Sequence, residues 1–145
     1  MQTGKIVFDV TKPPAEVWAR LVDLERAPDW VRSMRGSDKT TPGPVSVGTI
    51  FTQKVELNGA TNQADIKVTE YEEFNTFAHE GQSGPAAYSS RFELEAIEGG
   101  TRVVHSFSVS IGGIMQMMEP MMGAWLKKNS RESVFNLKRL IEAGQ

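Results

Sequence analysis

The sequence predicts an α+β fold in which six or seven antiparallel strands curve around one long C-terminal helix. Three observations predict it: residues 47–111 alternate between polar and apolar side chains, glycine-rich turns divide that stretch, and residues 114–143 follow helical periodicity. Antiparallel strands joined by tight turns bury one face and leave the other in water. The long helix is the cover that we expect for the buried face.

The chain begins with a short strand and two short helical pieces. Residues 5–10 are rich in β-branched side chains, which favours a strand. Pro13 and Pro14 fit the start of a helix, where a missing amide hydrogen costs nothing. Apolar residues then follow helical spacing at Val17, Trp18, Leu21 and Val22. Pro28 interrupts this pattern, so we expect a second short helix that ends near Trp30.

The middle of the chain divides into strands at its turn residues. Asn58-Gly59 is the strongest two-residue hairpin signal, and Gly99-Gly100 marks another hairpin. A loop containing Pro42, Gly43 and Pro44 separates the first two of these strands. The predicted strands cover residues 34–41, 47–57, 60–72, 75–82, 88–95 and 101–111. Together with the first strand they make an antiparallel meander.

The last third of the chain predicts the long helix. Its apolar stripe runs from Ile114 to Ile141, and Gly144 fits the residue that ends a helix. Pro120 lies inside this stretch. Proline removes a backbone donor, so Pro120 is expected either to kink the helix or to start a second segment.

Length, charge and composition exclude several classes of protein. The chain has 145 residues, a formal net charge of -2 and no cysteine. That length fits one domain, residues 1–145, and the balanced charge gives no reason to expect nucleic-acid binding. The absence of cysteine excludes disulfides and thiolate metal ligands. We find no signal-peptide pattern at residues 1–10 and no stretch of the ~18 apolar residues that a membrane span needs, so we expect a cytoplasmic protein without an integral membrane segment.

The order of these elements resembles a known superfamily over essentially the whole chain. The likeness is carried by Pro14-Ala15-Glu16-Val17-Trp18, Leu21, Asp23, Trp30, Val47-Gly48-Thr49, Gly100-Thr101-Arg102-Val103, Pro120, and Leu137-Lys138 with Glu142. These residues are similar to the START and birch-pollen-allergen (SRPBCC) superfamily, and most to its bacterial polyketide cyclase/dehydrase and lipid-transport group. The resemblance implies a helix-grip fold. It does not choose a function, because members include lipid carriers, hormone receptors, aromatase/cyclases, quinone-binding proteins and chaperone activators.

Five of the seven methionines lie between Met115 and Met122, and two interpretations of them stay open. They either fill the core between sheet and helix or form an adaptable apolar mouth. The topology favours a mouth, because the turns at Asn58-Gly59 and residues 81–85 and the Gly112-Gly113 entry into the helix all fall at one end of the sheet. In the superfamily such loops act as gates.

Two histidines and a few uncharged polar residues share the inward face of the predicted strands. His105 alternates with Val103 and Phe107, and His79 shares the parity of Phe77. Each histidine is either a hydrogen-bonded core group or a polar contact for a ligand, because a buried imidazole needs a partner. Gln53, Tyr88 and Ser90 are open to the same two interpretations. Two histidines on different strands without a nearby carboxylate do not predict a metal site.

The sequence lacks the motifs of most enzyme mechanisms. It has no glycine-rich phosphate loop, no serine in a nucleophile elbow and no pair of carboxylates expected to converge inward. An enzyme built on this chain would therefore orient a reactive substrate and use His105 or Tyr88 as proton shuttle.

Our first hypothesis is a module that binds or carries a small hydrophobic molecule, such as a lipid, a polyketide-like aromatic or an isoprenoid, between sheet and helix. The predicted lining is Phe51, Gln53, Val55, Ile66, Val68, Phe77, His79, Tyr88, Ser90, Phe92, His105, Phe107, Met118, Met122 and Trp125. The alternatives are a polyketide cyclase or dehydratase, and a protein-interaction domain resembling chaperone activators. We expect no cofactor, no metal, and a monomer or weak homodimer.

Overall fold

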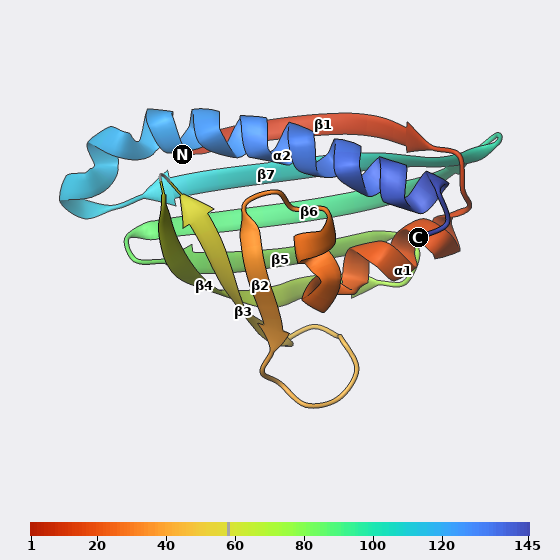
Figure 1. Ribbon diagram of the computed structural model, residues 1–145, viewed down its shortest axis with the longest axis horizontal. Helices are drawn as coiled ribbons and strands as arrows, with labels where there is room; N and C mark the ends of the chain where they lie inside the picture. The colour runs from red at the N-terminus through yellow and green to blue at the C-terminus, as the bar shows by residue number, and fades with distance from the viewer. Residues whose placement is uncertain (58) are drawn as a thin grey trace.

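Seven antiparallel strands form one sheet in the computed structural model, which describes residues 1–57 and 59–145. The strands are β1 (Gln2–Val10), β2 (Met34–Lys39), β3 (Ile50–Leu57), β4 (Ala60–Glu72), β5 (Thr76–Ser83), β6 (Ala86–Ile97) and β7 (Gly100–Ile111). Their order across the sheet is β1-β7-β6-β5-β4-β3-β2. The sheet curves, and the long helix α2 (Glu119–Glu142) lies along its concave side beside β1 and β7 (Figure 1). This confirms the predicted fold class.

Four helical segments complete the fold over the described residues: α1 (Pro14–Val22), the 3-10 helix η1 (Leu24–Asp29), the 3-10 helix η2 (Gly113–Met118) and α2 (Glu119–Glu142). The two short helices after β1 are those that the sequence predicts. Of the two expectations for Pro120, a kink or the start of a second segment, the structure agrees with the second, because the separate 3-10 helix η2 precedes α2. Pro120 lies in the first turn of α2, where a proline ring fits the helix and its missing donor is not needed.

The strands differ from their predicted bounds mainly at the turns. β3 begins at Ile50 rather than residue 47, and Gly100 already belongs to β7, so the β6–β7 turn is made by Glu98 and Gly99. Gly99 has a φ of 81°, a conformation that favours glycine. The predicted Asn58-Gly59 turn includes residue 58, which lies outside the described residues, although Leu57 pairs with Ala60 on either side of it.

A bulge in the second half of β4 contributes to the curvature of the sheet. The pairing of β4 with β5 shifts between Val68 and Glu70. A bulge bends its strand and increases the local twist, so it helps the sheet to close around a helix. Within the described chain, no helix is long and apolar enough to cross a membrane.

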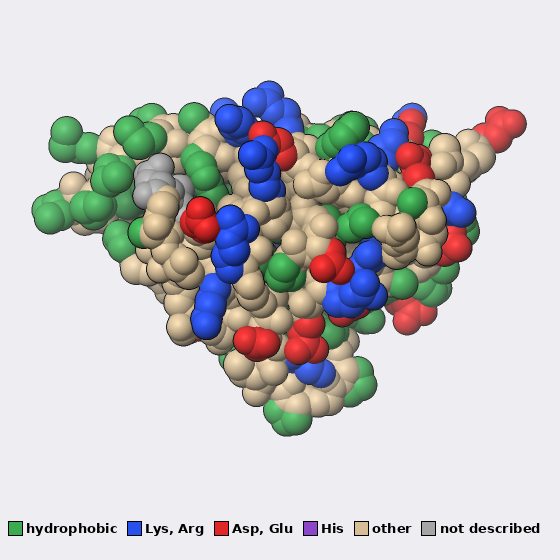
Figure 2. Space-filling model, viewed as in Figure 1, with side chains coloured by type: hydrophobic (Ala, Val, Ile, Leu, Met, Phe, Trp, Pro, Cys, Tyr) green, Lys and Arg blue, Asp and Glu red, His purple; other side chains and the backbone are tan. Residues whose placement is uncertain are grey.

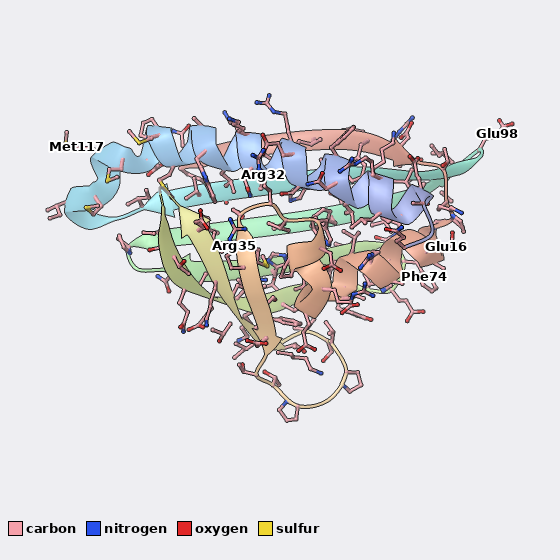
Figure 3. The ribbon with its side chains drawn as sticks, viewed as in Figure 1. Glu16, Arg32, Arg35, Phe74, Glu98 and Met117 are labelled. Atoms are coloured by element: carbon pink, nitrogen blue, oxygen red, sulfur yellow. The ribbon has the colours of Figure 1, made fainter. Side chains whose placement is uncertain are left out.

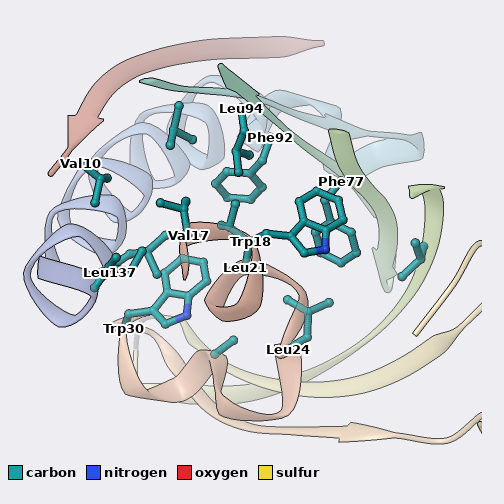
Figure 4. Packing of buried hydrophobic residues seen from close by; sticks show 14 of the residues in the cluster. Val10, Val17, Trp18, Leu21, Leu24, Trp30, Phe77, Phe92, Leu94 and Leu137 are labelled. Carbon is teal, nitrogen blue, oxygen red and sulfur yellow. The ribbon is translucent and has the colours of Figure 1, made fainter. Parts of the chain in front are cut away.

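The buried apolar residues divide into two clusters rather than one. The larger cluster lies at the end of the sheet that α1 covers and includes Trp18, Leu21, Phe77 and Leu137 (Figure 4). The Trp18 ring packs edge-on against the Phe77 ring with 6.0 Å between centroids. The smaller cluster lies at the other end and consists of Ala86, Val109, Ile111 and Met122, with Tyr88 and Leu126 packed against it. This division leaves room in the middle of the concave face.

Candidate ligand cavity

A hollow of about 360 Å³ lies between the concave face of the sheet and α2. Its wall reaches from Trp30 and Met34 of the larger core cluster to Met122 and Ile111 of the smaller one. Small-molecule sites have volumes of roughly 300–1,000 Å³, so this hollow is at the lower end of that range. It is far larger than the space of a few waters.

Twelve of the fifteen residues predicted as cavity lining lie on the wall of this hollow. They are Gln53, Val55, Ile66, His79, Tyr88, Ser90, Phe92, His105, Phe107, Met118, Met122 and Trp125. They come from five strands of the sheet, from η2 and from the first turns of α2. The structure therefore brings together residues that are up to 72 positions apart in the sequence.

The prediction is wrong for Phe51, Val68 and Phe77, which are fully buried in the larger core cluster and do not line the hollow. All three point to the concave face, as the alternation predicts. They lie at the end of the sheet where α1 and η1 pack, and Trp18 of α1 covers Phe77. The alternation of side chains along a strand determines which face of the sheet a residue lies on. Its position along the strand decides whether a helix fills the space above it.

Beyond the predicted Met118, Met122 and Trp125, the helices provide wall residues that were not predicted from the sequence. Leu126, Ser130, Ser133 and Val134 of α2 face the hollow, as do Leu24, Ala27 and Trp30 around η1. Met122, Leu126, Ser130 and Ser133 follow spacings of three and four residues, so they share one face of α2. This spacing could have predicted that these residues of α2 face the sheet. The small side chains of the two serines leave space between α2 and the sheet.

Four polar side chains form a group on the sheet side of the hollow, which we name the polar quartet: His79, Tyr88, Ser90 and His105. His79 pairs with Ser90 across β5 and β6, and Tyr88 lies two residues before Ser90 on the same face of β6. Ser90 Oγ and His105 Nε2 are hydrogen-bonded at 2.9 Å. The imidazole of His105 stacks in parallel on the Phe92 ring, with 4.1 Å between centroids.

Burial keeps both imidazoles of the quartet uncharged at neutral pH. It lowers the pKa of His79 to about 4, and burial together with the nearby His79 lowers the pKa of His105 to about 3. Burial also raises the pKa of the Tyr88 hydroxyl. Neutral imidazole has one donor and one acceptor nitrogen, so the quartet offers both kinds of hydrogen bond without a net charge.

Gln53 is a second polar position on the wall, on β3. Its side chain is buried, and Nε2 donates a hydrogen bond to Ser37 Oγ at 3.2 Å. Gln53 is therefore partly satisfied by the protein itself. Among the residues that the structure describes, no three histidine or acidic side chains lie close enough together to hold a metal ion.

The hollow opens at the end of the sheet where η2 lies. Met115, Met118 and Pro85 line it and are also exposed to solvent. Of the five clustered methionines, only Met122 is buried. Core filling therefore describes Met122 alone, whereas Met115 and Met118 line the hollow near its opening and Met117 and Met121 do not line it.

A family model for polyketide cyclase / dehydrase and lipid transport proteins matches residues 1–142. The structure is similar to a START superfamily protein from Mycobacterium smegmatis, with a TM-score of 0.83, 14% identity and full coverage of both chains. It is also similar to the aromatase/cyclase Zhui of Streptomyces sp. R1128, with a TM-score of 0.79, 14% identity, and coverage of 97% of this chain and 93% of that one.

A third similar structure is Ara h 8.0201, with a TM-score of 0.78, 16% identity and coverage of 97% of each chain. No curated protein matches the sequence. At these identities the solved structures establish the helix-grip fold alone, while the family model covers nearly the whole sequence. The chain belongs to the polyketide cyclase / dehydrase and lipid transport family.

Proposed function

We propose that the chain binds a small hydrophobic molecule in the hollow between sheet and α2 and holds a polar group of that molecule at the polar quartet. The observation that carries this proposal is the hollow of about 360 Å³ with the quartet on one wall. Apolar walls with a few polar groups are typical of small-molecule sites, where the polar groups orient the ligand.

The composition of the wall supports an apolar ligand. Ile66, Phe92, Phe107, Met122 and Val134 all contribute apolar surface, and no Lys, Arg, Asp or Glu lies among the lining residues in the part of the chain that the structure describes. A charged ligand group would have no counter-charge there and would lose its hydration. A hydroxyl or carbonyl group, in contrast, finds donors and acceptors at His79, Tyr88 and Ser90.

Fluorescence titration with the uncharged apolar dye N-phenyl-1-naphthylamine, followed by displacement with uncharged aromatic and isoprenoid alcohols, tests the proposal. Ala64→Phe places a ring into the hollow from β4, and Gln63→Phe places the same ring on the outer, exposed face one residue earlier. We expect Ala64→Phe to weaken dye binding at least about tenfold, and Gln63→Phe to leave it unchanged. Equal binding by both variants would show that the dye binds elsewhere.

A cyclase or dehydratase that works inside the same hollow is the second candidate. The observation in its favour is that His105 and Tyr88, the two candidate proton shuttles, both lie on the wall. The lowered pKa of His105, about 3, argues against a base that operates at neutral pH, because a general base works best with a pKa near the ambient pH.

His105→Ala separates these two functions. For an enzyme, this variant abolishes turnover of a poly-β-keto substrate, a loss far larger than its losses of stability and dye affinity explain. For a binding module, it changes only affinity and stability. The interaction-domain alternative requires a solid interior, and the hollow disfavours it. Its second requirement, an exposed apolar patch, is met at η2.

A further inference from the structure

Six apolar side chains are exposed together around η2 at the opening of the hollow. Ile114 is 94% exposed, Met117 is 91% exposed and Met121 is 64% exposed. Met1, Met115 and Met118 add to them, and the Met1 amino group contacts Glu119 at the start of α2. Figure 2 shows hydrophobic side chains gathered at this end of the molecule, and Figure 3 shows Met117 at its tip. Exposed apolar groups that lie together mark a contact surface.

The residues of η2 face two ways. Met115 and Met118 line the hollow, whereas Ile114 and Met117 are almost fully exposed and do not line it. Met121, at the first turn of α2, is also exposed and not part of the wall. The outward side chains, which we name the η2 tip (Ile114, Met117 and Met121), are therefore not explained by ligand binding or by the core.

Charge is distributed unevenly between the two ends of the sheet. Residues 59–64, 81–90 and 106–118, which meet at the η2 end, contain no charged residue, and the neighbouring Glu56 of β3 is neutralised by an ion pair with Arg35. The next charged residue, Glu119, is buried, and its carboxylate accepts a hydrogen bond from the Ile111 amide at 3.3 Å. The opposite end carries exposed acidic residues in its turns, Glu72, Glu73 and Glu98, and Figure 3 places Glu98 far from Met117.

Basic side chains border the η2 tip on the exposed side of α2. Lys127, Lys128 and Arg131 are all exposed, and Lys128 follows Met121 by seven residues, which puts both on one helix face. An apolar tip with basic residues behind it and acidic residues at the far end matches the surface of an anionic lipid bilayer. Such a surface attracts lysine and arginine and accepts apolar side chains among its acyl chains.

We propose that the η2 tip inserts into the surface of an anionic lipid bilayer, with Lys127, Lys128 and Arg131 against the headgroups. This orientation places the opening of the hollow at the membrane and the acidic turns away from it. Transfer of a ligand between bilayer and hollow rests on the proposed function, whereas docking itself rests only on the η2 tip and its charges.

Co-sedimentation with sucrose-loaded vesicles tests the docking. The vesicles contain phosphatidylcholine alone or phosphatidylcholine with 30% phosphatidylglycerol, at low and high sodium chloride. We expect the unaltered chain to bind the anionic vesicles, and to bind them several-fold less at high salt because salt screens exposed charges. Ile114→Ser/Met117→Ser should lower partition at least about tenfold. Val7→Ser/Val47→Ser, which also replaces two exposed apolar residues, should leave partition unchanged.

Lys127→Gln/Lys128→Gln tests the role of charge. It should lower binding to anionic vesicles by roughly fivefold to tenfold and leave binding to phosphatidylcholine alone unchanged. Ala64→Phe, which fills the hollow, should keep vesicle binding. In turn, Ile114→Ser/Met117→Ser should keep dye binding, so failure of docking and failure of ligand binding are distinguishable.

Three results would overturn the docking proposal. The first is absence of vesicle binding by the unaltered chain at low salt. The second is equal vesicle binding by the η2-tip variant and its control. The third is a concentration-dependent dimer, seen by analytical ultracentrifugation, that Ile114→Ser/Met117→Ser converts to a monomer, because a second copy of the chain would then cover the tip.

Discussion

Ser90 Oγ on β6 and His105 Nε2 on β7 are joined by a hydrogen bond of 2.9 Å inside the concave face of the sheet. The bond holds the His105 ring flat against Phe92 and fixes which nitrogen faces the serine. His105 Nδ1 is buried and has no partner among residues 1–57 and 59–145. Removing Ser90 would therefore leave the second nitrogen without its partner as well.

We expect Ser90→Ala to lower the free energy of unfolding by about 1–2 kcal/mol, because it leaves a buried ring nitrogen unsatisfied. Urea denaturation measures the change. Thr52→Val is the control, because it also removes a hydroxyl from the sheet, but Thr52 bonds Asp65 at 3.0 Å on the exposed side. The control should stay within about 0.5 kcal/mol. Equal losses in the two variants would contradict a special role for the Ser90–His105 bond.

Because both histidines are kept neutral in the fold, we expect the free energy of unfolding to fall in mild acid. Their folded pKa values, about 4 for His79 and about 3 for His105, lie below the value of 6.5 of an unperturbed histidine. The unfolded chain therefore takes up protons first as the pH falls, so this stability is present above pH 6.5 and is lost below it. Between pH 7.5 and 5.5 the expected loss is about 1 kcal/mol for each histidine.

Urea denaturation at these two pH values, for the unaltered chain, His79→Phe and His105→Phe, measures the effect. Each variant should lose about half of the pH dependence, whatever its stability at pH 7.5. Carboxylates remain ionised in this window and contribute little. An unchanged pH dependence in both variants would mean that neither imidazole is kept neutral by the fold.

Gly4 lies opposite Phe107 across β1 and β7, and an added Cβ at Gly4 would lie 2.4 Å from the end of the Phe107 ring. Because Phe107 lines the hollow, its ring can move into that space. We expect Gly4→Ala to cost about 1 kcal/mol of stability and to weaken dye binding several-fold. Gly112→Ala, where an added Cβ meets open space, should change neither quantity. Unchanged dye binding by Gly4→Ala would place Phe107 outside the binding site.

At Gly100, in contrast to Gly4, the atom that an added Cβ would meet belongs to the backbone. An added Cβ there would lie 2.0 Å from the Val10 carbonyl oxygen, a backbone atom that cannot rotate away. Gly100→Ala should therefore cost about 3 kcal/mol, more than Gly4→Ala, because backbone must shift in two strands. Thermal denaturation of the two variants under the same conditions shows which of them loses more stability. A smaller cost for Gly100→Ala would contradict the close approach of β7 to the end of β1.

We expect substitutions of Leu137 and Phe135, which lie on opposite faces of α2, to differ strongly in their effect on stability. Leu137 is fully buried in the larger core cluster, whereas Phe135 is exposed and lies near Arg139. Leu137→Ala should cost about 2–5 kcal/mol through lost packing and the space left behind. Phe135→Ala should cost less than about 1 kcal/mol. Chemical denaturation that gives similar values would mean that α2 packs on the sheet by a different face.

Periodicity was sufficient for the strands and their faces because it acts locally. The alternation of Phe51, Gln53 and Val55 places all three on the concave face, and the structure agrees for each. The same alternation does not distinguish Phe51, which lies in solid core, from Gln53, which lies at the hollow. That difference depends on where α1 and η1 pack across the sheet, which is a contact between segments far apart in the chain.

The sequence by itself determined the order of the elements, the α+β class, the resemblance to the family and the special place of Pro120. These follow from chemistry within a few neighbouring residues: side-chain alternation, turn glycines, and a proline ring at the start of a helix. Only the tertiary structure decided that the core divides into two clusters with a hollow between them, that Ser130 and Ser133 help to leave that space, and that Ile114 and Met117 face outward. Each of these depends on how side chains from segments far apart in the sequence fill the same space. The local sequence pattern does not contain that information.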